Sequence, residues 1–203
     1  MPEFQIMPDH FNGLPRLWGI DYGAKAAGTT VIAKVDSNLN IFFTQSAKKA
    51  DADAFLRDAV SQNPPTHIFL DAPLSVPLAC RHTYPTEEGD FHYRSCDREL
   101  QAMSPMFLGG LTARAMKFAQ FCKRREVSVF ETYPAGIARH MGWQNRPFGM
   151  VEDWLHNQYG LTISEEPKNP HQFDALLALV SALRYFSGTA LRIGDEKEGV
   201  VIL

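Results

Sequence analysis

Four acidic residues stand where a protein can gather carboxylates into one site. Asp21 follows Leu-Trp-Gly-Ile, Asp71 follows His-Ile-Phe-Leu and Glu131 follows Val-Ser-Val-Phe, so each ends a short apolar run typical of a buried strand. Asp174 lies near the start of a strongly apolar segment with helical spacing. Residues at strand ends line the crevice in which open α/β sheets bind ligands. We therefore expect the four acids at one edge of a sheet.

Clustered carboxylates need a compensating charge. At a few ångströms they repel by roughly 4 kcal/mol per pair at a surface-like dielectric, so a proton or a cation must join them. Hard oxygen ligands favour Mg²⁺ or Mn²⁺, and two such ions can activate a water and stabilise the leaving oxygen of a phosphodiester. We expect Asp21, Asp71 and Asp174 to bind the metal. Glu131 and His171 complete the candidate catalytic set, His171 as a proton shuttle or further ligand three residues before Asp174 on one helical face.

Each of these acids also has a simpler interpretation. Asp21-Tyr-Gly and Asp71-Ala-Pro are ordinary strand-to-turn sequences, and Asp174 could complement the dipole of its helix. Glu131 could equally end a strand and pair with a neighbouring arginine. The apolar run before each strand acid favours a common site.

The middle of the chain is basic, although the whole chain has a net charge of −3. Residues 81–125 hold eight Lys or Arg against five Asp or Glu, so an anionic partner would bind there. Candidate phosphate ligands are Lys25, Arg94, Arg98 and Arg114.

The alternatives for these cations are structural. Lys25 could be a solvated turn residue. Arg94 and Arg98 could instead tie a long connection onto the sheet by pairing with the nearby acids Asp97, Glu99 and Glu131.

Cysteines, histidines and aromatic residues give weaker signals. Three widely spaced cysteines argue against a disulfide framework and read as reduced thiols. A second set could bind Zn²⁺, although its spacing is not a usual finger pattern: Cys80, His82, His92 and Cys96. Three aromatic residues of the same region could stack on bases or pack a loop onto the core: Tyr84, Phe91 and Tyr93.

Hydrophobic periodicity predicts the elements that position these residues. Short polar connections favour an antiparallel meander of the first three strands, and each later strand follows a helix, as parallel strands require. The proline-rich stretch 72–95 is expected to be a long inserted connection. The predicted strands are 17–21, 28–35, 39–45, 67–71, 127–131 and an edge strand at 199–203; the predicted helices are 51–62, 113–125, 150–159 and 175–186, the last opening at Pro170.

The 203 residues are 45% hydrophobic, which is enough for one core. We expect a single domain over 1–203, with 1–16 as an N-terminal extension. The sequence holds no apolar stretch of membrane-spanning length and no signal-peptide pattern, so we expect a cytoplasmic protein without a membrane partner. The oligomeric state stays open.

Several short motifs occur in a fixed order. The set resembles the uncharacterised family known as domain of unknown function 429, over roughly residues 17–203. The motifs are Trp18-Gly-Ile-Asp-Tyr-Gly23, Asp71-Ala-Pro-Leu-Ser75, Arg94-Ser-Cys-Asp97-Arg98, Leu111-Thr-Ala-Arg114, Glu131-Thr-Tyr-Pro134, His171-Gln-Phe-Asp-Ala175 and the closing Glu198-Gly-Val-Val-Ile.

The resemblance implies a ribonuclease H-like α/β fold: a mixed five-stranded sheet, an antiparallel meander followed by parallel strands, flanked by helices. It also implies nuclease activity, and the His171-x-x-Asp174 pair is similar to that of Holliday-junction resolvases. Two departures affect the site. Ribonuclease H takes a Glu from its first helix, where this chain has Asp53 and Asp58, and resolvases have a Glu where this chain has Asp71.

The sequence thus predicts a Mg²⁺- or Mn²⁺-dependent nuclease acting on DNA or RNA. One alternative is a non-catalytic nucleic-acid-binding or scaffold protein that retains the fold. Another is an actin-like phosphotransfer domain, because Asp21-Tyr-Gly23 is similar to the first phosphate loop of those proteins. They need two such domains, and this chain has room for one.

Overall fold

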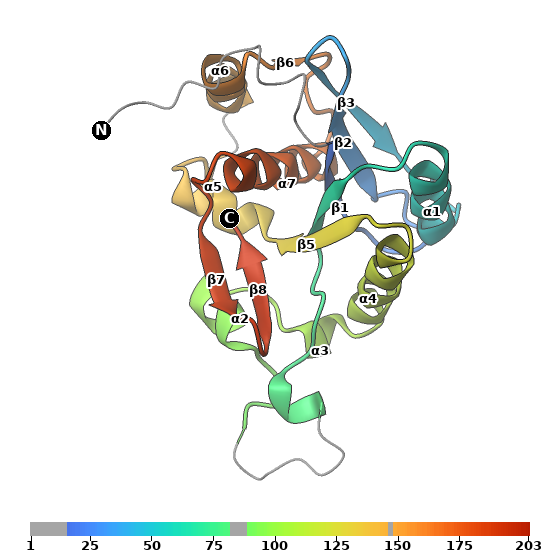
Figure 1. Cartoon of the computed structure of the whole chain (residues 1–203), viewed down its shortest axis with the longest axis vertical. Helices are drawn as coiled ribbons and strands as arrows, with labels where there is room; N and C mark the ends of the chain where they lie inside the picture. Colours follow the sequence, from blue (N-terminus) through green and yellow to red (C-terminus); the bar gives the residue numbers. More distant parts are fainter. Residues whose placement is uncertain (1–15, 82–88, 146–147) are drawn as a thin grey trace.

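A computed structural model describes residues 16–81, 89–145 and 148–203. Their strands form one eight-stranded sheet in the order β6-β3-β2-β1-β4-β5-β8-β7 (Figure 1). The strands are β1 (Leu17–Asp21), β2 (Val31–Val35), β3 (Asn40–Gln45), β4 (His67–Asp71), β5 (Ser128–Thr132), β6 (Thr162–Ile163), β7 (Arg192–Asp195) and β8 (Gly199–Ile202); the helices are α1 (Ala52–Gln62), the 3-10 helix η2 (Leu78–Arg81), α2 (Ser95–Leu100), α3 (Pro105–Leu108), α4 (Gly110–Lys123), α5 (Pro134–His140), α6 (Phe148–Tyr159) and α7 (Pro170–Phe186).

The first five strands have the predicted arrangement. β1, β2 and β3 form an antiparallel meander. β4 pairs with β1 in parallel, and β5 pairs with β4 in parallel. The predicted mixed sheet flanked by helices is therefore confirmed.

The prediction of five strands is corrected to eight among the described residues. β8 lies between β5 and β7 and is not at the edge, and the two-residue β6 pairs with β3. β7 has the sequence Arg-Ile-Gly-Asp, which lacks the alternation of apolar and polar residues that marks a half-buried strand. It forms because its pairing with β8 supplies the backbone hydrogen bonds.

The long region after β4 contains more structure than predicted. η2 lies within it, α2 and α3 follow it, and α5 begins at Pro134, a residue suited to the first turn of a helix. Residues 82–88, with His82 and Tyr84, lie outside the described part. None of the described helices is long and apolar enough to cross a membrane.

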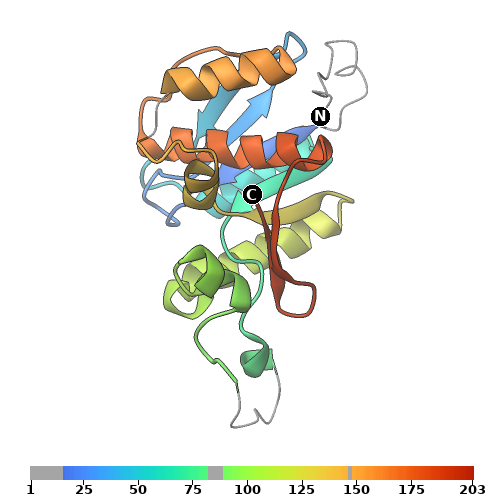
Figure 2. The same cartoon turned by 90° about the vertical axis from the view of Figure 1, so that its left-hand side faces the viewer.

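The sheet separates two hydrophobic clusters because successive strand residues point to opposite faces. α7 packs on one face, where Leu17 and Phe69 contribute to the core. α1 and α4 cover the other face, where Ile20 and Leu70 contribute (Figure 2). α7 is buried nearly all round, which explains its strongly apolar sequence.

β1 and α7 are in contact through Gly19. A Cβ atom built at Gly19 would lie 2.1 Å from the backbone nitrogen of Leu179 and 2.4 Å from the carbonyl oxygen of Ala175. The absence of a side chain at Gly19 therefore allows α7 to lie directly on β1.

Gly19→Ala should lower the free energy of unfolding by about 3 kcal/mol or more, because backbone atoms of α7 must move to admit the methyl group. Urea unfolding monitored by circular dichroism measures the change. Gly149→Ala is the matched control: an added Cβ on this exposed residue of α6 meets nothing within 4 Å, so we expect a gain of about 0.5 to 1 kcal/mol. Equal effects of the two substitutions would contradict the close packing of β1 on α7.

Candidate active site

The pleat of the sheet places Asp21 and Asp71 side by side. They are register partners at the ends of the parallel strands β1 and β4. Every second residue of a strand points to the same face, so Asp21 lies on the face of Leu17 and Asp71 lies on the face of Phe69. This is the face that α7 covers. In β5, Glu131 is the register partner of Leu70 and belongs to the opposite face.

The first turns of α7 bring further groups to Asp21 and Asp71. The Asn169 side chain caps the helix by accepting a hydrogen bond from the backbone N–H of Gln172. His171 Nδ1 lies 2.7 Å from Oδ2 of Asp21. Asp174 follows one turn later, and its charge acts on Asp71. His171 thus contacts Asp21 directly, whereas Asp174 acts on Asp71 through its charge and lines a separate cavity with Arg139.

The pKa of Asp71 reflects its burial and the neighbouring acids. Burial raises the pKa of Asp71 well above its ordinary value, and the charges of Asp21, Asp174 and Glu131 raise it further. The folded protein therefore resists ionisation of Asp71 unless positive charge is added nearby.

The donor chemistry of Asp21, Asp71 and Asp174 fits a hard divalent cation, because all the donors are carboxylate oxygens and their mutual repulsion favours positive charge. The geometry is less complete. Within residues 16–81, 89–145 and 148–203, no three His, Cys, Asp or Glu side chains lie close enough in this conformation to hold one metal ion. The three aspartates interact electrostatically without forming a closed ligand set.

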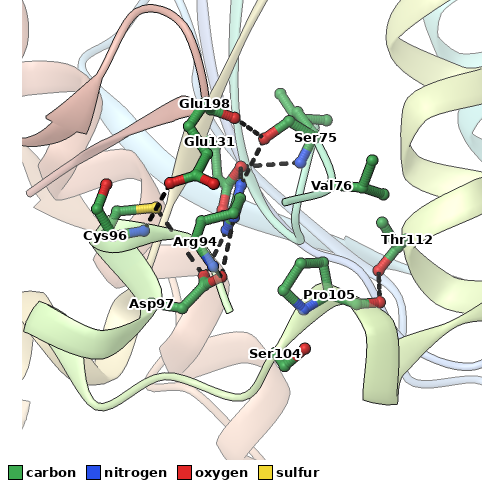
Figure 3. A network of polar contacts seen from close by, with 12 residues as sticks. Ser75, Val76, Arg94, Cys96, Asp97, Ser104, Pro105, Thr112, Glu131 and Glu198 are labelled. Atoms are coloured by element: carbon green, nitrogen blue, oxygen red, sulfur yellow. Dashed lines mark hydrogen bonds and ion pairs between the residues drawn. The ribbon is translucent and has the colours of Figure 1, made fainter. Parts of the chain in front are cut away.

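Glu131 is bound to the buried guanidinium of Arg94 (Figure 3). Nη1 and Nη2 of Arg94 donate to the two carboxylate oxygens of Glu131 at 2.8 and 2.6 Å. Nε and Nη2 of Arg94 donate to Asp97 at 3.0 and 2.6 Å, and Nη1 also donates to Ser75 Oγ at 2.9 Å. All five N–H donors of the guanidinium are therefore engaged.

The hydrogen bonds of Arg94 connect the start of α2 with the sheet. Ser75 Oγ donates to the carbonyl oxygen of Glu198, which precedes β8. The carboxylate of Glu198 accepts from the backbone N–H groups of Leu78 and Ser95. Arg94 is one of the candidate phosphate ligands. It is 1% exposed, and its contacts are those of the alternative interpretation, in which Arg94 pairs with nearby acids and ties the long connection onto the sheet.

A cavity of about 220 Å³ opens beside the strand ends. Asp21, Asp71 and Glu131 contribute to its lining together with apolar side chains that include Met103 and Leu111. Met103 is 62% exposed, so the apolar wall borders solvent. The cavity therefore combines an acidic end with an apolar wall.

The other predicted phosphate ligands lie outside this cavity. Lys25 is exposed and pairs with Asp51 at 3.3 Å. Arg98 pairs with Asp90 on the surface and stacks over the ring of Tyr93 at 4.7 Å.

Arg114 lies beside the end of β1. It pairs with Asp53 at 2.7 Å and donates to the carbonyl oxygen of Gly23 at 3.2 Å. The Tyr22 hydroxyl donates to the same Asp53 carboxylate at 2.6 Å. Asp53, one of the two acids of the first helix, is thus held by Arg114 and Tyr22.

Cys80, His92 and Cys96, the described members of the candidate zinc set, do not form a metal-binding group. Cys80 Sγ lies 3.3 Å from the carbonyl oxygen of Phe91, to which it donates. Cys96 is buried in the core, and burial raises its pKa to about 12, which opposes formation of a thiolate ligand. Tyr93 packs edge-on against Phe107, whereas Phe91 is 36% exposed.

The strand order, the mixed strand directions and the helices on both faces match the mixed α/β architecture expected from the sequence. No protein-family model and no curated protein matches the chain, so the resemblance to domain of unknown function 429 stays a prediction.

Two solved structures of RuvC from Thermus thermophilus are similar to the chain. The first is 15% identical and covers 85% of this chain and 96% of its own, with a TM-score of 0.45. The second, RuvC in complex with a Holliday junction substrate, is 14% identical and covers 87% and 98%, with a TM-score of 0.47.

Arg94→Gln should lower the free energy of unfolding by about 3 to 5 kcal/mol, because it leaves two carboxylates buried without their cation. Chemical denaturation at pH 7 measures the change. Arg98→Gln removes the same charge from an exposed pair with Asp90 and should cost less than about 1 kcal/mol. Similar losses for the two variants would mean that Arg94 is not the structural tie described above.

Asp71→Asn should stabilise the cation-free protein by about 1 kcal/mol or more at pH 7 and by less at pH 4. The folded pKa of Asp71 lies above the unfolded value, so the wild type loses stability as the pH rises from about 4 towards the folded pKa. Asparagine cannot ionise and escapes this loss. Urea unfolding in EDTA across this pH range tests the difference. The exposed control Asp153→Asn should show no such trend, and a flat difference for Asp71→Asn would contradict the repulsion.

Proposed function

We propose that the protein is a divalent-cation-dependent phosphodiester hydrolase acting on nucleic acid, with its active site at the ends of β1 and β4. The observation that carries the proposal is the pairing of Asp21 and Asp71 in register under the first turns of α7, where neighbouring charges raise the pKa of Asp71. Such a site favours the binding of positive charge.

In this proposal Asp21, Asp71 and Asp174 hold the cation. A bound divalent cation would supply activation of water and neutralisation of charge on the phosphodiester. With the proton on Nδ1, His171 donates to Oδ2 of Asp21 and fixes the orientation of that carboxylate. Glu131 acts as a positioning residue, because its hydrogen bonds to Arg94 and to the backbone N–H of Leu74 hold the loop after β4.

The adjoining cavity supports a nucleotide unit as the bound group. Its acidic end lies at the strand ends, and its apolar wall is formed by the region around Met103 and Leu111. A nucleotide has the matching pair of chemistries, a phosphate that a cation can bridge to the carboxylates and a base with an apolar face.

A non-catalytic nucleic-acid-binding protein is the second candidate. One observation favours it: the described residues contain no preformed group of three metal-ligating side chains. Isothermal titration with Mn²⁺ separates the two functions. Binding at micromolar to millimolar Mn²⁺ supports the hydrolase, and heat-silent titration at millimolar Mn²⁺ supports the binding protein.

Asp21→Asn and Asp71→Asn should each abolish Mn²⁺-dependent cleavage, with a loss of at least about 100-fold, because each removes a charged oxygen ligand. The assay uses a panel of single-stranded and duplex DNA, RNA, an RNA–DNA hybrid and a four-way junction. Asp153→Asn makes the same charge change at an exposed site on α6 and should cleave like the wild type. Undiminished cleavage by Asp21→Asn would overturn the assignment of the metal site.

A further inference from the structure

A second cavity lies between α1 and α4, which are adjacent on one face of the sheet (Figure 1). We call it the α1–α4 groove, and its volume is about 540 Å³. Five of its lining side chains are cationic and two are acidic. The lining residues are Lys25, Asp51, Asp53, Arg57, Arg114, Lys117, Phe118, Phe121 and Arg124.

The charge of the α1–α4 groove is opposite to that of the whole chain. Each acid already pairs with a cation, Asp51 with Lys25 and Asp53 with Arg114. The remaining three cations give the groove a net charge of +3, whereas the chain carries −3. These cations are Arg57, Lys117 and Arg124. A concentration of positive charge in a concave surface favours anions.

One face of α4 carries the basic side of the groove. Arg114, Lys117, Phe121 and Arg124 follow one another at intervals of three, four and three residues, which places them along a single helical stripe. The stripe is about 15 Å long at 1.5 Å per residue, and a nucleic-acid strand advances about 3.4 Å per nucleotide. It can therefore face the backbone of about four nucleotides.

The same helix connects the α1–α4 groove with the acidic site. Leu111, one turn before Arg114, lines the cavity that holds Asp21 and Asp71. Arg114 itself lies over the ring of Tyr22, the residue after Asp21, at 4.8 Å from the ring centroid. The groove and the acidic site therefore adjoin at the end of β1, and a strand that leaves the groove at Arg114 has to pass around this end of the sheet to reach Asp21 and Asp71.

We propose that the α1–α4 groove binds the phosphate backbone of the nucleic acid and guides it from Arg57, Lys117 and Arg124 towards Asp21 and Asp71. The proposal rests on the proposed function for the identity of the anion. It adds a binding site with three cations that are not among the predicted phosphate ligands: Arg57, Lys117 and Arg124. Nucleic acid is favoured over an acidic peptide because the groove adjoins, through the contact of Arg114 with Tyr22, the site proposed for phosphodiester chemistry.

The test measures binding separately from cleavage. Arg57→Gln combined with Lys117→Gln is compared with the wild type for binding of a 30-base-pair DNA duplex, a single strand of the same length and a poly-glutamate peptide. All titrations are done in EDTA at several salt concentrations, so that binding is measured without metal-dependent turnover. Circular dichroism melting shows that the variants are folded.

We expect the double variant to bind DNA about 10- to 100-fold more weakly near 0.1 M salt. The slope of log K against log salt should fall by about 1.8 on duplex DNA, because each phosphate contact contributes about 0.9. The matched control, Arg192→Gln with Lys197→Gln, removes two exposed cations of the β7–β8 hairpin and should bind like the wild type.

If the variant with Arg57→Gln and Lys117→Gln binds DNA with unchanged affinity and salt slope, the proposal that the α1–α4 groove binds nucleic acid is wrong. Equal wild-type affinity for poly-glutamate and DNA would overturn the choice of nucleic acid. The proposed hydrolase fails in a different way: Asp21→Asn then cleaves like the wild type, or no cleavage occurs at all, while the EDTA binding results still decide the groove.

Discussion

The ion pairs of Arg94 are the interaction on which the arrangement of the site depends. Burial of a guanidinium and two carboxylates is costly unless every donor and acceptor is satisfied. Here the five N–H groups of Arg94 meet Glu131, Asp97 and Ser75. One side chain thus connects β5, α2 and the segment after β4. It also offsets the charge of Glu131, so that the repulsion around Asp71 comes chiefly from carboxylates on the α7 face.

The distribution of charge follows from this division of the acids. Negative charge is concentrated at the ends of β1 and β4, whereas positive charge is concentrated along α4, with Arg57 of α1 beside it. The two regions meet at Tyr22 and Arg114. The net charge of −3 is therefore the sum of an acidic region and a basic region that adjoin each other.

Local sequence patterns predict the central strands, the last helix and the acids that end the strands, because each depends on residues close in sequence. They do not predict partners. From the sequence, Arg94 could bind a phosphate or pair with Glu131. Only the burial of its side chain in the fold decides between these two roles. The sequence does not predict β7, because its residues lack a regular apolar pattern and the strand depends on its pairing with β8. The stripe along α4 is visible as helical spacing, but Arg57 joins it from α1 through tertiary structure alone.

The pleat decides which acids can act together. A strand alternates its faces with every residue, so a shift of register by one residue would move a side chain from one face to the other. The pairing of Asp21 with Asp71 puts both on the face of α7, where His171 reaches Asp21 across 2.7 Å. Glu131, paired with Leu70, is directed to Arg94 instead. Three acids that look equivalent in sequence therefore lie in two different surroundings, two on the α7 face of the sheet and one in the Arg94 network.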